Sequence, residues 1–249
     1  MWTCVDGPAY PDGVLRAAAV ARLKSLYILG RDDAASREMA EAAQLQAARL
    51  GLRVAKLDIY PRSLSDFLPQ IYEAMGADAD AWIAFGDARD AAEMVKTFKR
   101  HGFAPGFFYA RGAVDPRFIE RVGQDAELTL ASAEYDPRLP LPGNASFARA
   151  YRVKWSLPPG PLAAAAYAAG QVLAAAVVRA GSAEPEKLRA TLATLEVDTV
   201  LGTYRVDRAT GAQLGMQPTL VQIVRGRAEP VKDYVVKPYP QWSERVPLQ

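Results

Sequence analysis

The chain has 249 residues, of which 50% are hydrophobic and 23% charged, a composition typical of a globular protein with one or two domains. Its single cysteine, Cys4, excludes an internal disulfide framework and a cysteine-rich metal site, and its single histidine, His101, excludes a multi-histidine metal site. Thirty basic and 28 acidic residues are scattered and nearly balanced, so nothing indicates a nucleic-acid partner. We expect no metal.

The first ten residues, Met1–Tyr10, lack the features of a secretory signal peptide. They contain no basic segment, no apolar core and no cleavage site. If Met1 is the true start of the protein, we therefore expect a cytoplasmic location.

Strand patterns and helix patterns alternate over the first half of the chain. Strands are predicted at Leu23–Gly30, Leu52–Ile59, Ala81–Phe85, Gly106–Ala110 and Leu128–Ala133. Helices are predicted from Asp32 or Asp33 to Leu50, over Asp66–Met75 after a cap at Ser63 or Ser65, over Asp87–His101 and over Pro116–Val122. This spacing predicts an α/β fold with a parallel, doubly wound sheet.

The pattern changes after Tyr135, where the proline-rich segment Asp136–Gly143 has the composition of a crossover or hinge. Beyond it, helices are predicted at Ser146–Ser156, Leu162–Ala180 and Pro185–Leu195, and strands at Thr199–Val206, Pro218–Val224 and Lys232–Val236. We therefore divide the chain into two regions, 1–135 and 136–249.

An uncharged segment, Gly160–Val178, is long enough to cross a bilayer. Nine of its nineteen residues are alanines, which have little preference for lipid, and Gln171 lies near its middle. The segment is better interpreted as an alanine-rich helix that packs closely against a sheet.

Ligands of open α/β sheets bind beyond the carboxyl ends of the strands, so we expect a site along one rim of the sheet. This rim is formed by Asp32–Ser36, Gly86–Arg89, Ala110–Ala113 and Glu134–Tyr135. Neither glycine-containing loop matches G-x-G-x-x-G or a P-loop, and we expect no cofactor. An alternative interpretation of Asp33 and Asp87 is that they only cap helices.

Several stretches together resemble the leucine/isoleucine/valine-binding branch of type 1 periplasmic binding proteins, the substrate-binding components of ABC transporters. The segment YILGRDDAASREMAEAAQLQAARLGLRV resembles the first strand–helix–strand of their C-terminal lobe, and AFGDARDAAEMVKTFKRHGF resembles a later strand, ligand loop and helix. Further matches are AAAAYAAGQVLAAAVVRAGSAEPEKLRATLATLEVDTVLGTYRVD and GAQLGMQPTLVQIVRGR. The resemblance implies a periplasmic receptor that binds a small polar or aromatic carboxylate or amino-acid-like ligand without catalysis and delivers it to permease subunits.

The opening of the N-terminal lobe, with its "I-G-x-x-x-P-x-S-G" strand, is absent from this sequence. The resemblance therefore implies a C-terminal-type ligand-binding lobe over 1–135 and a partial second lobe over 136–249. Helices within Ser146–Leu195 would lack much of the sheet that they cover. Either they repack, or they associate with a partner or a second copy, or the protein starts upstream of Met1.

The resemblance also implies a set of ligand-binding residues. Ala35 and Ser36 replace a "Y-G" pair, Asp87 replaces an aromatic residue, and Arg111 replaces a glutamate that receives the ammonium of an amino acid. A guanidinium repels an ammonium and matches a carboxylate, so Arg111 is expected to pair either with a ligand carboxylate or with Asp87. The expected site comprises Ala35, Ser36, Asp87 and Arg111, with Glu134 and Tyr135 at its edge.

Other functions remain open on the sequence alone. The same fold could serve as a cytoplasmic sensor of an amide or amino acid, or the chain could be a truncated remnant that binds no ligand. A hydrolase is disfavoured, because no G-x-S-x-G motif is present and His101 is expected at a helix end, where it interacts with the helix dipole.

Overall fold

The computed structural model describes residues 5–244, which form two compact units. The sheet unit comprises Tyr10–Ser132 and the chain from Leu220 onward, and the helical unit comprises Ala133–Thr219 and the N-terminal residues up to Ala9. Residues 220–244 therefore belong with the first region of the chain, whereas the sequence grouped them with the second.

The sheet unit contains a seven-stranded sheet in the order β2-β1-β3-β4-β5-β8-β9. Strands β1 to β5 pair in parallel, so the predicted doubly wound α/β fold is confirmed, while β8 and β9 form an antiparallel hairpin. The strands are β1 Ser25–Arg31, β2 Arg53–Tyr60, β3 Ala81–Phe85, β4 Phe107–Ala110, β5 Leu130–Ala133, β8 Thr219–Val224 and β9 Arg227–Pro230.

The strand predicted at Lys232–Val236 is wrong, because the last strand of the sheet is β9 at Arg227–Pro230. The hairpin turns at Arg225 and Gly226, whose φ angles of 52° and 70° match the left-handed two-residue turn that suits the twist of antiparallel strands. The chain therefore reverses earlier than the sequence pattern indicated.

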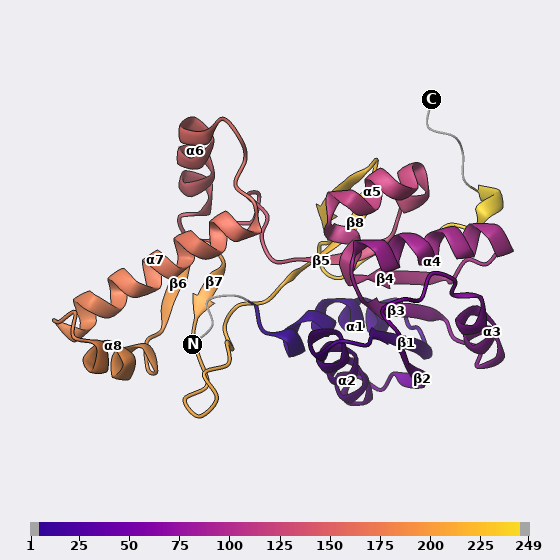
Figure 1. Ribbon diagram of the computed structural model, residues 1–249, viewed down its shortest axis with the longest axis horizontal. Helices are drawn as coiled ribbons and strands as arrows, with labels where there is room; N and C mark the ends of the chain where they lie inside the picture. The colour runs from indigo at the N-terminus through magenta and orange to yellow at the C-terminus, as the bar shows by residue number, and fades with distance from the viewer. Residues whose placement is uncertain (1–4, 245–249) are drawn as a thin grey trace. The chain divides into compact units, whose positions relative to one another are not determined.

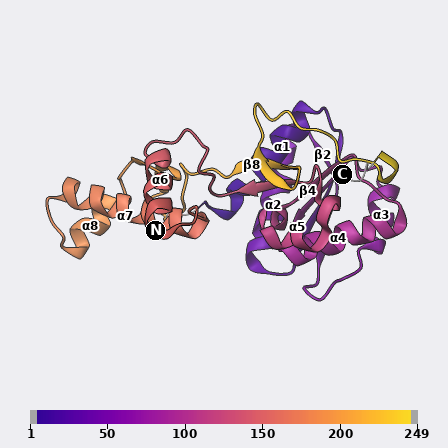
Figure 2. The same ribbon diagram turned by 90° about the horizontal axis from the view of Figure 1, so that it is seen from above.

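Helices cover both faces of this sheet, with α1 and α2 on one face and α4 and α5 on the other, and α3 lies beside α4 (Figures 1 and 2). Their bounds are α1 Tyr10–Val20, α2 Ala34–Arg49, α3 Leu68–Gly76, α4 Ala88–His101 and α5 Pro116–Val122. Asp33 and Asp87 cap α2 and α4 with their side chains. The predicted serine cap of α3 is wrong, since Phe67 precedes that helix without a side-chain cap.

The core of the sheet unit is built around Trp82 in the fully buried strand β3. Its ring lies 4.9 Å from Phe98 of α4 on an edge-to-face geometry and 5.3 Å from Tyr27 of β1, measured between ring centroids. A central parallel strand is covered on both faces, which explains its unbroken run of apolar residues.

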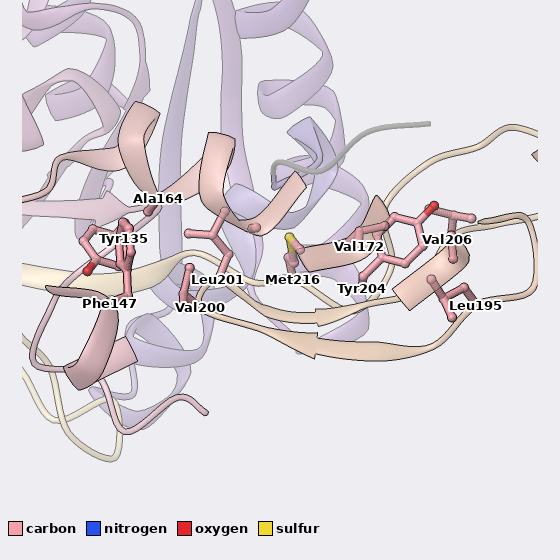
Figure 3. Close-up of a cluster of buried hydrophobic side chains, with 12 residues drawn as sticks. Tyr135, Phe147, Ala164, Val172, Leu195, Val200, Leu201, Tyr204, Val206 and Met216 are labelled. Atoms are coloured by element: carbon pink, nitrogen blue, oxygen red, sulfur yellow. The ribbon is translucent and has the colours of Figure 1, made fainter. Parts of the chain in front are cut away.

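Among the described residues, the helical unit contains three α-helices and a small two-stranded sheet. Its core runs along one side of the longest helix, from Tyr135 and Phe147 at one end to Tyr204 and Val206 at the other (Figure 3). Its elements are α6 Asn144–Trp155, α7 Pro161–Ala180, α8 Pro185–Leu192, β6 Val197–Thr199 and β7 Gly202–Tyr204.

Helix α7 is the one helix among the described residues that is long and apolar enough to cross a membrane. A buried stripe of four side chains, each four residues apart, packs it into the core of the helical unit. This stripe consists of Ala164, Ala168, Val172 and Ala176. Length and composition alone are weak evidence for a membrane span, because core helices of soluble proteins meet the same criteria.

Candidate functional site

The candidate site lies at the carboxyl ends of the parallel strands in the sheet unit. The strand order reverses there, since β1 lies between β2 and β3, and open α/β sheets bind their ligands at such a switch point. Arg31 ends β1, Tyr60 ends β2, Asp87 follows β3 and Arg111 follows β4. Charged and polar side chains therefore converge on one edge of the sheet.

Arg31 is the centre of a network of carboxylates at this edge. Its guanidinium donates a hydrogen bond from Nη1 to Oδ2 of Asp87. The same nitrogen lies 3.6 Å from Oδ2 of Asp90, and Nε lies 3.7 Å from Oδ2 of Asp33. Burial alone would lower the pKa of Arg31, but these carboxylates raise it overall, with Asp87 the strongest of them.

Asp87 is held in its ionised form by the groups around it. Its carboxylate accepts hydrogen bonds from the backbone N–H groups of Arg89 and Asp90 at 2.9 and 3.1 Å. Burial raises the pKa of Asp87, but the hydrogen bonds from the Asp90 backbone and the Arg31 guanidinium outweigh it, and the net shift is downward. The carboxylate is thus already engaged by a helix cap and an ion pair.

Asp90 is buried beneath this ion pair. Its Oδ2 accepts a hydrogen bond from the hydroxyl of Tyr60 at 3.1 Å and a weaker one from the backbone N–H of Asp87 at 3.3 Å. Burial, and then repulsion by Asp87, raise the pKa of Asp90 above its ordinary value. Burial, and then the charge of Asp90, also raise the pKa of Tyr60.

Two glycines let the loops of this edge pack directly on one another. A Cβ atom on Gly86 would lie 2.1 Å from the hydroxyl oxygen of Tyr60, and one on Gly112 would lie 2.1 Å from the carbonyl carbon of Asp87. Gly112 belongs to the short 3-10 helix η2, Arg111–Val114. The space between these residues is too small for a water molecule.

Arg111 stands next to this packed centre but does not join its ion pairs. Its guanidinium carbon lies 5.2 Å from the ring centroid of Tyr10 in α1, within the range of a cation–π interaction. Its Nε is buried without a hydrogen-bond partner. Within the described part of the chain no carboxylate pairs with Arg111, because Asp87, the neighbour proposed from the sequence, pairs with Arg31.

Ser36 and Ala35 lie in the first turn of α2. The hydroxyl of Ser36 donates to Oδ2 of Asp33 at 3.0 Å, and its backbone N–H donates to Oδ1 at 2.9 Å. The polar groups of Ser36 are therefore used to start the helix, while Ala35 is exposed and apolar.

Glu134 and Tyr135 follow β5 and belong to the helical unit, whereas the other four residues of the expected site belong to the sheet unit. The ring of Tyr135 is buried against Phe147, at a centroid distance of 6.2 Å (Figure 3). Burial, followed by the charge of Asp136, raises the pKa of Tyr135 to about 12.

Three residues of this edge were missing from the sequence prediction, namely Arg31, Tyr60 and Asp90. Arg31 and Tyr60 could have been found as the last residues of their strands, where open sheets present side chains to ligands. Asp90 was harder to predict as a site residue, because an acidic residue in the first turn of a helix usually only stabilises the helix by interacting with its dipole.

A family model described as "Periplasmic binding protein" matches residues 3–228 of the chain. Solved structures share the fold. A leucine-binding protein of Thermotoga maritima is 23% identical with a TM-score of 0.78, and the match covers 94% of this chain and 67% of that one. A solute-binding protein of R. palustris, solved with benzoate, is 18% identical with a TM-score of 0.72, covering 94% and 65%.

A third structure, an extracellular ligand-binding receptor of Rhodopseudomonas palustris HaA2, is 20% identical with a TM-score of 0.75, and the match covers 91% of this chain and 68% of the receptor. The chain therefore spans about two thirds of the length of these structures. The family model covers most of the sequence, and the chain belongs to the periplasmic binding protein family.

Proposed function

We propose that this chain binds a small carboxylate without catalysis and that Arg111 is its anchor. The observation that carries the proposal is the state of Arg111, whose buried Nε has no partner and which no described carboxylate neutralises. A partly buried guanidinium without a counter-ion is unfavourable, so an anion from outside the chain would be stabilised there. A planar carboxylate fits the donor geometry of a guanidinium.

The other charged groups of the edge support a carboxylate rather than an ammonium as the recognised group. An ammonium needs a free carboxylate, but Asp87 is paired with Arg31 and Asp33 is occupied by Ser36. Asp90 is buried and accepts the hydroxyl of Tyr60. The ligand class is thus a small monocarboxylate without an ammonium group, of which benzoate, named for one structure of the same fold, is a member.

The biological context that we propose follows the family. Such a protein would deliver its ligand to the permease subunits of an ABC importer on the outer side of the cytoplasmic membrane. The relatives named above are described as leucine-binding, solute-binding and extracellular ligand-binding proteins.

The test is an NMR titration of the chain with benzoate and with leucine. We expect weak binding of benzoate, because the chain spans only about two thirds of its relatives, with shifts centred on residues 110–114. Leucine should bind more weakly still, since no free carboxylate of this edge receives its ammonium. Arg111→Ala should abolish the shifts, since a hydrogen bond to a charged group contributes roughly 1.5–3 kcal/mol. Arg111→Lys should retain only part of the affinity.

The matched control is Arg89→Ala, which removes an exposed arginine from the same edge. It should leave the titration unchanged. If neither carboxylate shifts any resonance of the wild-type chain, or if Arg89→Ala weakens binding as much as Arg111→Ala does, the proposal is wrong.

A further inference from the structure

Helix α7 of the helical unit has no polar face. Its buried stripe packs against the core, yet large apolar side chains also stand on the opposite side, where Leu162 is 88%, Leu173 51% and Val178 83% exposed. Apart from the hydroxyl of Tyr167, its one polar side chain before Arg179 is Gln171, whose Oε1 accepts the backbone N–H of Val200 at 3.1 Å within the unit. A helix that is apolar all round is normally covered on all sides.

We propose that a second copy of this chain covers the exposed face of α7, with the two α7 helices antiparallel and crossing at Gly170. Gly170 lies in the middle of the exposed arc, and a Cβ atom added to it would meet nothing within 4 Å. A glycine at the crossing point lets two helix backbones approach closely.

The sequence on either side of Gly170 is complementary to itself. In an antiparallel pair, each residue faces the one that is equally far from the centre on the other side. Small residues then face each other near the crossing and large ones at the margins, the pairs being Ala166 with Ala174, Tyr167 with Leu173, and Leu162 with Val178. The same face thus serves both copies, as a two-fold interface requires.

Charge and area set the expected strength of this contact. No charge lies on α7 between Pro161 and Val178, so two chains of net charge +2 meet there without repulsion at the contact. A helix of this length spans roughly 30 Å, and a strip about 10 Å wide buries on the order of 600 Å² over both copies. That is below the size of a standard stable complex, so the dimer should form only at micromolar or higher concentrations.

The first experiment is disulfide cross-linking of the full chain in a Cys4→Ser background. Gly170→Cys should cross-link to itself under mild oxidation. A mixture of Leu162→Cys and Val178→Cys chains should form the mixed species in preference to either homodimer. The control is Leu45→Cys, which places a thiol at an apolar position of α2 that is 67% exposed, and it should not cross-link.

The second experiment is sedimentation velocity over a hundredfold range of concentration. The wild-type chain should shift from monomer to a discrete dimer. Leu173→Lys should weaken the dimer at least tenfold, and Leu45→Lys should leave it unchanged, with circular dichroism confirming that both variants fold.

Three results would overturn the proposal. One is a monomer at every concentration, which would fit a face reserved for the third of the relatives' chains that has no counterpart here. Another is open-ended association with equal cross-linking at positions 45 and 170. The third is binding of the chain to neutral phospholipid vesicles that Leu173→Lys abolishes.

Discussion

The sheet unit and the helical unit differ in how completely they cover their own apolar surface. In the sheet unit, helices lie on both faces of the sheet and strand β3 is buried throughout. In the part of the helical unit that the structure describes, the sheet consists of two three-residue strands, and a twenty-residue helix exposes one apolar side. A two-stranded sheet gives little stability by itself, so the second unit depends more on what else packs against it.

The substitution with the largest expected effect on stability lies at the packed edge of the sheet unit. Gly112→Ala places a methyl group 2.1 Å from the backbone carbon of Asp87, so the two loops must separate. We expect a loss of about 3 kcal/mol or more in the free energy of unfolding, measured by urea denaturation. Gly76→Ala is the control, because its Cβ meets no atom and it ends α3 without a positive φ. Equal stability of the two variants would contradict this account of the edge.

A second change would separate the two units in a denaturation experiment. Phe147 is buried in the helical unit and stacks on Tyr167 at 4.4 Å. Phe147→Ala should cost about 3–4 kcal/mol and melt the helical unit, while hydrogen exchange in β1, β3 and β4 stays slow. Simultaneous loss of protection in both units would show that they unfold together.

A smaller effect concerns pH. Because the pKa of Asp90 is raised in the folded state, its protonated form stabilises the fold fully below the ordinary value of 3.8, and this contribution is lost as the pH rises through the raised value. Asp90→Asn keeps an oxygen that accepts the hydrogen bond from the Tyr60 hydroxyl, but it does not titrate. As the pH is raised just above 4, the free energy of unfolding of this variant should therefore fall less than that of the wild type. Glu120→Gln, an exposed control, should follow the wild type.

Much of the fold could be predicted from the sequence, because local signals agree with the tertiary structure. Strand β3 and helix α5 have the predicted bounds, one as a short apolar run and the other between Pro116 and Gly123. Helix α1 was missed because Pro11 and Gly13 obscure its pattern. Whether such a segment forms a helix is decided by its packing against residues elsewhere in the chain.

The site was less predictable, for a physical reason. The ion pair between Arg31 and Asp87 joins residues far apart in the sequence, and it exists because β1 and β3 pair with Gly30 opposite Phe85. Without that register, the sequence left two partners for Arg111, a ligand carboxylate or Asp87. Strand ends indicated which loops form the edge, but only the register assigns partners within it.

The position of β8 beside β5 has a consequence for how the chain folds as it is synthesised. The backbone N–H of Leu128 donates to the carbonyl of Ile223 at 2.8 Å, and that of Ile223 donates to Thr129 at 2.9 Å. The segment Ala133–Thr219 of the helical unit lies between these partners, so the edge of β5 stays unpaired until the last part of the chain has been made. Unpaired strand edges on partly made chains are sites of aggregation. During synthesis, the interval between residues 133 and 224 is therefore the period in which a chaperone would protect this protein most.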